Sequence, residues 1–294
     1  MQLHGKTILL TGAASGIGKA LAMQLAQAGS DLALIDRDQD GLRRVAEELQ
    51  PTGVVVHTWA CDLADPDQID ATLADLMAST DVIDILINNA GVAWYGATHE
   101  MSQKHWDWLM SVNLLAPIRI TQRLLPHLLE RPDAHIVNMC SISGLVAGGR
   151  FAAYHTSKFG LIGFTESLRA EYGRCGVGVS AICPGPVTTN LYSAAEHPED
   201  GKKVPQPPDI VCATPERVAR LTLKAIKRNR RMVLITPMAH GLFQLKRFFP
   251  GLLDMVSGFS RSRKRRRLER LQAEEHRLAA LRASTEDLSG SRAA

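Results

Sequence analysis

Cysteine is scarce in this sequence, and its placement offers no cross-linking pattern. The 294 residues contain five cysteines, which are odd in number, widely spread and free of any C-x-x-C pair. This excludes a disulfide framework and a thiolate zinc site, and it suits a reducing compartment. The chain also lacks an apolar run of about 18 residues and a basic, then apolar, N-terminal segment. We therefore expect a cytoplasmic protein with no transmembrane helix and no metal site.

The rest of the composition is typical of a protein with a core, but its charge is unevenly divided. Hydrophobic residues make up 45% of the chain and charged residues 22%, which excludes wholesale disorder. The net charge is +4, yet residues 227–294 carry 16 Lys and Arg against 6 Asp and Glu. Residues 1–226 then hold 18 basic and 24 acidic side chains. The positive charge therefore belongs to the C-terminal tail.

Short apolar runs alternate with helix-like segments through most of the chain. Apolar residues at helical spacing end at Gly29 in one segment and at Pro51 in the next. The runs between them are nearly continuously apolar, as in parallel strands covered on both faces. This repetition predicts an α/β fold with a doubly wound parallel sheet of about seven strands. The predicted strands are Thr7–Leu10, Leu32–Ile35, Val54–Thr58, Ile83–Ile87, Ile136–Met139, Val177–Ile182 and Met232–Ile235.

Two changes in the pattern divide the chain. The stretch Leu191–Ala213 contains several prolines and charges, so we predict a long loop or lid there. After Thr236 the sequence is apolar but interrupted, then strongly basic, and Leu268–Ser284 has a helical composition. We therefore predict a domain over residues 1–236 and a partly flexible helical extension over residues 237–294.

A glycine-rich turn joins the first predicted strand to the first helix. Residues 11–18 read TGAASGIG, a G-x-x-x-G-x-G spacing rather than G-x-G-x-x-G. Glycines there let backbone N–H groups and a helix N-terminus approach a pyrophosphate. A tight turn without a ligand is the alternative, and the strand–turn–helix context favours phosphate binding.

An acidic residue closes the second predicted strand. Asp36 lies 24 residues after Gly12, where a carboxylate can bind both hydroxyls of an adenosine ribose and repel a 2′-phosphate. It is also suited, at the same time, to be the N-cap of the following helix or a turn aspartate before it. Its neighbour Arg37 is suited to hold a 2′-phosphate. Ser15 leaves the glycine loop without a positive charge. We predict NAD as the cofactor, with NADP as the alternative.

A serine, a tyrosine and a lysine then follow in an order that indicates carbonyl chemistry. Ser141 lies just past a predicted strand, at the edge where open α/β sheets bind ligands. Tyr154 and Lys158 are four residues apart and share one helix face. An ammonium group nearby favours the phenolate of a tyrosine, whose unperturbed pKa is ~10. A packing tyrosine and a solvated lysine are the alternatives for each residue alone.

In their order and spacing, these motifs resemble the short-chain dehydrogenase/reductase family of the single-domain type. The resemblance covers about residues 5–236 and implies a Rossmann-like fold. It also implies an NAD(P)-dependent oxidoreductase that interconverts a secondary alcohol and a ketone. A non-catalytic dinucleotide-binding sensor, or a membrane-surface scaffold on the same fold, is the alternative. The motifs are TGAASGIG, Cys61-Asp62-Leu63, Asn88-Asn89-Ala90-Gly91, Asn113, Ser141, Tyr154-x-x-x-Lys158 and the segment Pro184–Thr189.

The resemblance implies a role for each matching catalytic residue. Tyr154 would be the general acid/base, Ser141 would orient the substrate carbonyl, and Lys158 would also hold the nicotinamide ribose. Asn113 would anchor a water-mediated proton relay. Local departures, Cys140 before Ser141 and His155 after Tyr154, remove no catalytic group. We expect His155 at the surface or at an interface.

Other matching residues would bind the cofactor. Asp62 would meet the adenine edge, Asn89 the nucleoside region, and Val187 with Thr189 the carboxamide. The predicted cofactor-binding residues are Gly12, Ser15, Gly16, Ile17, Gly18, Asp36, Arg37, Asp62, Leu63, Asn89, Ala90, Gly91, Tyr154, Lys158, Pro184, Gly185, Val187 and Thr189.

Partners and substrate are the least constrained predictions. The resemblance implies a homodimer or homotetramer, packed through an outer face bearing Leu161, Phe164 and Leu168. The apolar segment Leu242–Leu253 predicts a wall for a hydrophobic alcohol or ketone, and packing on a neighbouring subunit is the alternative. Trp94 and Tyr95 are candidates to line the cleft. Trp106 and Trp108 are candidates too, with helix packing as their default. 

The tail allows two interpretations. It can be a helix over the substrate cleft with a solvated end, or a peripheral contact with the inner membrane surface through its basic cluster. Residues 261–267 hold six basic side chains in seven, each worth ~1 kcal/mol near anionic lipid. No aromatic or helix-turn-helix module accompanies them, so no nucleic-acid partner is expected.

Overall fold

The computed structural model describes residues 1–80, 82–192, 194–197 and 204–252. The chain forms two compact units, Met1–Phe243 and Gln244–Ala294, and the division falls within α8 (Pro237–Phe248). The predicted helix Leu268–Ser284 and the basic run at 261–267 lie outside the described residues. Among those that are described, no helix is long and apolar enough to cross a membrane.

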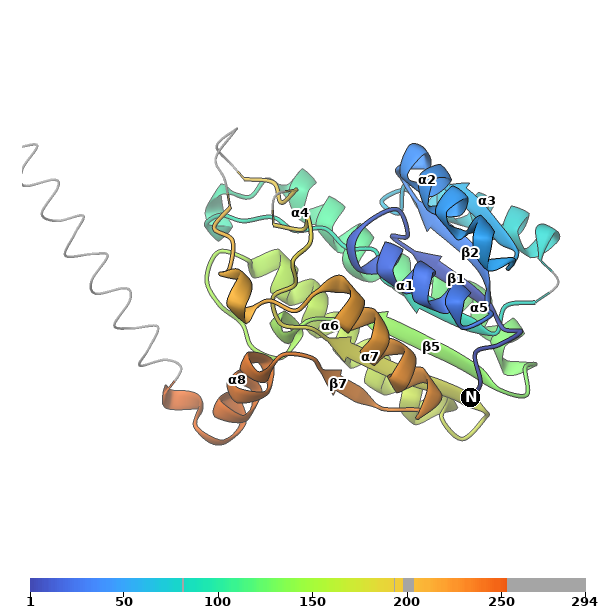
Figure 1. Ribbon diagram of the computed structural model, residues 1–294. Coiled ribbons are helices and arrows are strands. Elements are labelled where there is room, and N and C mark those ends of the chain that lie inside the picture. Colours follow the sequence, from blue (N-terminus) through green and yellow to red (C-terminus); the bar gives the residue numbers. More distant parts are fainter. Residues whose placement is uncertain (81, 193, 198–203, 253–294) are drawn as a thin grey trace, which may run out of the picture. The chain divides into compact units, whose positions relative to one another are not determined.

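Seven strands form one parallel sheet in the first unit (Figure 1), in the order β3-β2-β1-β4-β5-β6-β7. The strand order reverses between β1 and β4, and such a switch point opens a crevice at the carboxyl ends of the strands. The prediction of a doubly wound parallel sheet of about seven strands is confirmed. The strands are β1 (Thr7–Thr11), β2 (Asp31–Asp36), β3 (Val56–Ala60), β4 (Ile85–Asn88), β5 (Ala134–Met139), β6 (Val177–Cys183) and β7 (Met232–Leu234).

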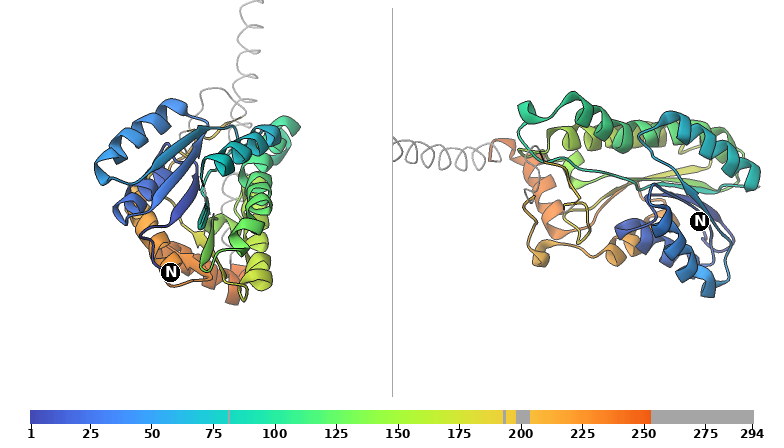
Figure 2. Two further views of the ribbon diagram at one scale, coloured as in Figure 1. Left: turned by 90° about the vertical axis from the view of Figure 1, so that its right-hand side faces the viewer. Right: turned by 90° about the horizontal axis from the view of Figure 1, so that it is seen from above.

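Helices cover both faces of this sheet (Figure 2). One layer consists of α1 (Gly16–Gln27), α2 (Gln39–Leu49) and α7 (Pro215–Lys227). The opposite layer consists of α3 (Pro66–Ser79), α5 (Ala116–Leu129) and α6 (Ala152–Tyr172), with α4 (Gln103–Met110) before α5. Because both faces are covered, every strand at the centre of the sheet is apolar on both sides, which explains the continuous hydrophobic runs in the sequence.

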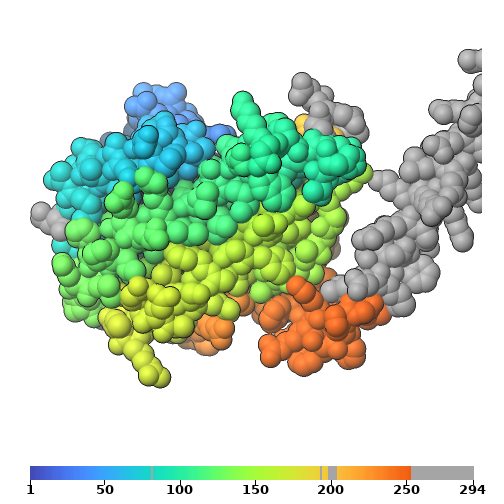
Figure 3. Space-filling view, turned by 180° about the vertical axis from the view of Figure 1, so that it is seen from behind, coloured from blue at the N-terminus to red at the C-terminus, as the bar shows by residue number. Residues whose placement is uncertain are grey.

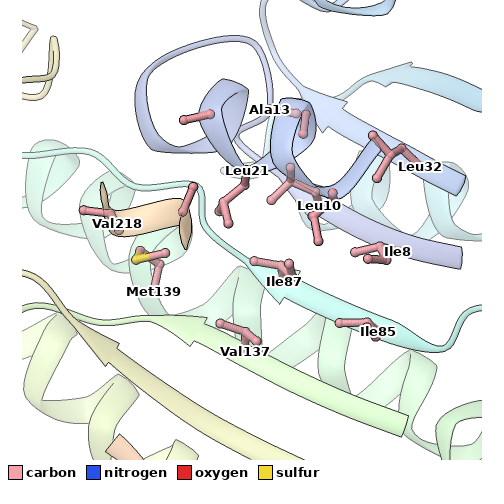
Figure 4. Close-up of a cluster of buried hydrophobic side chains, with 14 of the residues drawn as sticks. Ile8, Leu10, Ala13, Leu21, Leu32, Ile85, Ile87, Val137, Met139 and Val218 are labelled. Carbon is pink, nitrogen blue, oxygen red and sulfur yellow. The ribbon is translucent and has the colours of Figure 1, made fainter. Parts of the chain in front are cut away.

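The core on the α1 side shows how strand and helix patterns meet. Leu10 and Ile87 come from neighbouring strands and are fully buried (Figure 4). Leu21 of α1 and Val218 of α7 meet them from the helix layer and are equally buried. This packing fixes the position of α1, and so the direction in which its N-terminus points.

The outer face of α6 differs from the prediction. Leu161 and Leu168 are 1% and 5% exposed, and Phe164 packs against the same buried clusters. The prediction that these three side chains point outward is wrong, because this stripe lies against the sheet. The exposed stripe of α6 instead carries Phe159, which is 38% exposed. Figure 3 shows this green and yellow-green side of the molecule, formed by α5 and α6.

Candidate active site

A cavity of about 420 Å³ lies along the carboxyl ends of the strands. Ser141 and all of the predicted cofactor-binding residues are on its wall; among the predicted catalytic residues, Asn113 is not. The list of predicted site residues lacked a second group of wall residues, mostly apolar and drawn from loops, helices and a strand. This group comprises Cys61, Val92, Ala93, Val112, Met139, Cys140, Ile142, Ser143, Phe151, Pro186, Asn190, Leu191, Tyr192, Ala194, Glu196 and Met238.

The glycine loop is shaped by close backbone contacts. Gly12 has a φ of +67°, in the left-handed region that favours glycine. A Cβ on Gly18 would overlap the carbonyl oxygen of Gly12. Ser15 is the N-cap residue of α1, but its hydroxyl does not cap the helix, and the first turn carries no acidic side chain. The first N–H groups of α1 thus border the cavity without a side-chain acceptor, as an anion site requires.

A hydroxyl fastens the glycine loop to the end of β4. Thr11 Oγ1 accepts hydrogen bonds from the backbone N–H groups of Asn89 and Ala90, at 3.0 and 3.1 Å. The Asn89 amide donates in return to the carbonyl oxygens of Thr11 and Gly12, at 2.9 and 3.1 Å. Asn89 therefore holds the loop as well as lining the cavity. No role was predicted for Thr11, because a threonine at the end of a strand belongs to no sequence pattern of its own.

Asp36 supports the same loop from β2. Its Oδ2 accepts from Ala14 N at 3.0 Å and its Oδ1 from Asp38 N at 3.1 Å. The residue that begins α2 is Asp38, whose carboxylate accepts from Gly41 N at 2.9 Å. Asp36 is therefore not the N-cap of the helix, and its bond to Asp38 N makes it the turn aspartate that was the other part of this alternative. Asp36 and Arg37 both border the cavity. The residue that would favour NAD and the residue that would favour NADP therefore lie at the same end of the cavity.

Tyr154 and Ser141 meet at the other end of the cavity. Tyr154 lies in the first turn of α6, and Ser141 directly follows the strand-end residues Met139 and Cys140. Both side chains line the cavity. Burial raises the pKa of Tyr154 above its usual value, and this outweighs the neighbouring Ser141 side chain, which lowers it. Without cofactor the phenol is therefore protonated at neutral pH and can donate a proton.

Lys158 lies beneath the tyrosine. Its ammonium is 5.8 Å from the centre of the Tyr154 ring and donates to the carbonyl oxygen of Met139 at 2.9 Å. The side chain is 4% exposed. Burial lowers the pKa of Lys158, while the Cys140 and Cys183 thiols oppose that change. The hydrogen bond to Met139 O thus fixes the position of the Lys158 nitrogen at the base of the cavity.

Asn113 lies in a π-helical turn, Ser111–Leu115, between α4 and α5. Its amide oxygen accepts from Val92 N at 2.8 Å, and its amide nitrogen donates to Val92 O at 2.9 Å and to Ser157 Oγ at 3.3 Å. Asn113 therefore connects the loop after β4 to α6, one turn from Tyr154. Single π-turns often occur at functional sites, but no sequence pattern announced this one.

Aromatic side chains form much of the substrate end. Trp106 and Trp108 both pack in one hydrophobic cluster, and Trp108 also lines the cavity. Phe151 and Tyr192 also line it, with ring centroids 6.5 Å apart. The ring centroid of Tyr95 lies 5.0 Å from that of Phe151.

His155 does not lie where the sequence predicted. Its Nδ1 donates to Ser143 O and its Nε2 accepts from Gly148 N, both at 2.9 Å. The ring is partly buried and ties the loop after Ser141 to the start of α6. The expectation of a surface or interface histidine is corrected to a local brace for the catalytic segment.

Glu196, in the described part of the segment predicted as a lid, lies on the wall of the cavity. Glu196 forms a parallel bridge with Trp94, and Tyr95 N donates to Glu196 O at 2.9 Å. The Glu196 carboxylate also lies 3.1 Å from His105 Nε2. In the described part of the chain, no group of three His, Cys, Asp or Glu side chains is arranged to hold a metal.

This arrangement matches known proteins along most of the chain. Residues 6–200 match the short chain dehydrogenase family. The chain belongs to this family. Oxidoreductase UcpA of Salmonella typhimurium is 36% identical over 207 residues, which are 69% of this chain and 78% of that protein. Members of the family are oxidoreductases that act on CH–OH groups, and so is this protein.

Two solved dehydrogenase structures share the fold. A short-chain dehydrogenase/reductase from Burkholderia phymatum in complex with NAD is 28% identical, with a TM-score of 0.76 over 86% of this chain and 96% of that one. A metagenomic short-chain oxidoreductase in complex with NADP is 31% identical, with a TM-score of 0.67 over 80% and 98%. The two complexes hold different nicotinamide cofactors.

Proposed function

We propose that this dehydrogenase interconverts a hydrophobic secondary alcohol and its ketone with NAD, and that Tyr154 is its general acid/base. The observation that carries the proposal is the meeting of Ser141, Tyr154 and Lys158 at one end of a cavity whose other end is the glycine loop. A dinucleotide sensor would need the loop but not these three side chains. The sensor and scaffold alternatives are therefore less well supported.

The residues present fit a nicotinamide dinucleotide. The open N-terminus of α1, from Gly16 to Gly18, suits the pyrophosphate. Asp36 suits the adenosine ribose, and Asp62 and Leu63 border the adenine end of the cavity. The bound nicotinamide supplies or accepts a hydride.

The protein's own groups then handle the proton and the carbonyl oxygen. In reduction, Ser141 and Tyr154 both donate hydrogen bonds to the carbonyl oxygen, and Tyr154 passes its proton to that oxygen as charge develops there. Lys158 stabilises the phenolate that remains, because its ammonium lies below the ring. In oxidation the same phenolate takes the proton back.

The wall of the cavity supports a hydrophobic substrate. Trp108, Phe151 and Tyr192 surround the position next to Tyr154, and Leu191 and Met238 add apolar surface. Burial of apolar area gives affinity, while the Ser141–Tyr154 pair fixes orientation. Met238 lies ahead of the segment Leu242–Leu253, and the contribution predicted for that segment stays a prediction.

Removing the hydroxyl oxygen of Tyr154 tests the mechanism. Tyr154→Phe should abolish turnover, since it removes the transferred proton, while NAD binding measured by fluorescence should stay within a few-fold. Tyr172→Phe, at the other end of α6, is the matched control and should keep wild-type turnover. A panel of cyclic, long-chain and short alcohols and ketones supplies the substrates.

Two results would contradict the proposal. Full turnover by Tyr154→Phe would remove the assigned acid/base. Tight NAD binding by the wild type without turnover on any member of the panel would favour the sensor.

A further inference from the structure

Two buried cysteines meet behind the reacting groups, and the proposed mechanism uses neither. Cys140 lies between Met139, the last residue of β5, and Ser141. Cys183 is the last residue of β6. Both are buried, and both belong to one cluster with Leu161 of α6. Each thiol shifts the pKa of the other, since Cys183 lowers the pKa of Cys140 and Cys140 raises the pKa of Cys183.

The backbone holds the two residues opposite each other. β5 and β6 pair in parallel up to Met139 and Ile182, one position before the cysteines. Two residues further on, Ile142 N donates to Pro184 O at 2.8 Å. Backbones joined on both sides of a position are about 4.8 Å apart, within the range of about 4.4–6.8 Å that a disulfide spans between Cα atoms.

Cys140 is also the member of the pair that small molecules can reach. It lines the cavity, whereas Cys183 lies behind it with 0% of its surface exposed. Burial raises the pKa of the Cys140 thiol, but the neighbouring Cys183 thiol and the Lys158 charge together hold it below its usual value. A thiolate at this position is a nucleophile facing the cavity.

We propose that Cys140 is a peroxide-modification site, with Cys183 as the resolving thiol. The Cys140 thiolate attacks one oxygen of hydrogen peroxide, the O–O bond breaks, and sulfenic acid and hydroxide form; a proton converts the hydroxide to water. The Cys183 sulfur then attacks the Cys140 sulfur, the S–O bond breaks, and a second water leaves as the disulfide forms. Two thiols are oxidised and one peroxide is reduced.

The disulfide would act on the catalytic residues through their supports. Cys140 lies between Met139, whose carbonyl holds Lys158, and Ser141, whose side chain lowers the pKa of Tyr154. Drawing the Cys140 sulfur onto Cys183 moves this segment. A displacement of ~1 Å near a reacting group costs about a hundredfold in rate. This consequence for rate rests on the proposed function, whereas the cross-link itself does not.

The experiment treats the full chain with hydrogen peroxide and follows mass and turnover together. The expected product is lighter by two hydrogen atoms and gives a peptide pair joined through Cys140 and Cys183. Turnover should fall about a hundredfold and return with dithiothreitol. Cys183→Ser should form no such pair and should instead carry a sulfenic acid on Cys140, trapped by dimedone.

Cys175→Ser is the matched control, because Cys175 is exposed and remote from the pair in sequence. It should form the cross-link like the wild type. A treated protein that is oxidised at Cys175 alone, with Cys140 and Cys183 still reduced, overturns the proposal. A cross-link in a protein without turnover leaves this inference standing and counts against the proposed function instead.

Discussion

At the scale of the residue, Asp36 combines a structural and a selective task. Its two oxygens already hold the backbone at Ala14 and Asp38, so the charge sits rigidly at the ribose end. A fixed carboxylate repels a 2′-phosphate more effectively than a mobile one, and this is the basis for expecting NAD.

Asp36→Asn should narrow the preference for NAD over NADP. The amide keeps the shape of the side chain but loses the charge, so NADP should bind about tenfold more tightly, equal to about 1.4 kcal/mol. Fluorescence titration with both cofactors measures the change. Asp40→Asn, an exposed carboxylate in the same region, is the control. A wild type that already binds NADP more tightly would show that Arg37 decides the preference.

His135 gives the fold a pH dependence that can be tested directly. It is 1% exposed within β5, and its Nε2 lies 2.9 Å from Ser180 Oγ. Burial, with the nearby Arg169 charge, lowers its pKa to about 3. Below its unfolded pKa of ~6.5, the unfolded chain therefore binds a proton that the folded chain excludes. The stability present above pH ~6.5 is lost as the pH falls toward the folded pKa.

Unfolding by urea at several pH values tests this sign. The wild type should lose up to about 1.4 kcal/mol per pH unit from this one group below pH ~6.5. His135→Gln lacks the titration, so the stability difference between the two proteins should shrink between pH 7 and pH 5, values that bracket the ~6.5 of an unfolded histidine. A difference that stays constant with pH would show that His135 does not titrate on unfolding.

Residues with a local sequence pattern were the predictable ones. Gly12, Gly18, Tyr154 and Lys158 have fixed spacings, and the structure places all four on one cavity. Trp108 has no such pattern, because helical periodicity does not say whether an aromatic faces a core or a cleft.

At the scale of the element, the seam between β1 and β4 controls the glycine loop. The Thr11 hydroxyl is buried and accepts hydrogen bonds from two backbone N–H groups. The loop cannot close against β4 without an acceptor at this point.

Thr11→Val should loosen this seam. Leaving buried N–H groups unpaired costs about 1–3 kcal/mol in the free energy of unfolding, and NAD should bind more weakly because the loop forms part of its site. Thr58→Val, on the exposed side of β3, is the control and should change neither quantity. Urea unfolding and fluorescence titration give the two readouts. Equal values for both variants would remove Thr11 from the support of the loop.

Element identity was more predictable than element orientation. Each of the seven predicted runs overlaps a strand. Strands buried on both faces leave a continuous apolar run, whereas β3 and β7, at the two edges of the sheet, are only partly buried. The stripe Leu161, Phe164 and Leu168 was read correctly as apolar but assigned to the wrong side of α6. A helix with exposed Phe159 opposite buried Leu161 shows two apolar faces, and periodicity does not rank them.

At the scale of the whole molecule, the exposed face of α5 and α6 bears on self-association (Figure 3). Phe159 of α6 is 38% exposed, and Leu115 beside α5 is 54% exposed. Large apolar side chains on a helix face are typical of a contact between copies of a chain. We expect the homodimer or homotetramer to form through this face.

Phe159→Glu should therefore lower the oligomeric state. A charge placed in the centre of an apolar contact is desolvated without a partner, so the assembly should dissociate at micromolar concentration. Light scattering measures the mass. Ile210→Glu introduces the same charge at a residue that is 94% exposed on the loop before α7, and it should leave the mass unchanged. A monomeric wild type would contradict the expectation.

The π-turn at Ser111–Leu115 changes which way the residues after it face around the helix axis. One extra residue per turn advances everything after it by about 100° around the helix axis. Trp108 before the turn can therefore face the cleft while Ile120 after it faces the core, on what is otherwise a single continuous rod. Excision of a single codon within 111–115 would rephase the rod. Asn113 would move away from Val92. Trp108 could then no longer face the cleft while Ile120 faces the core.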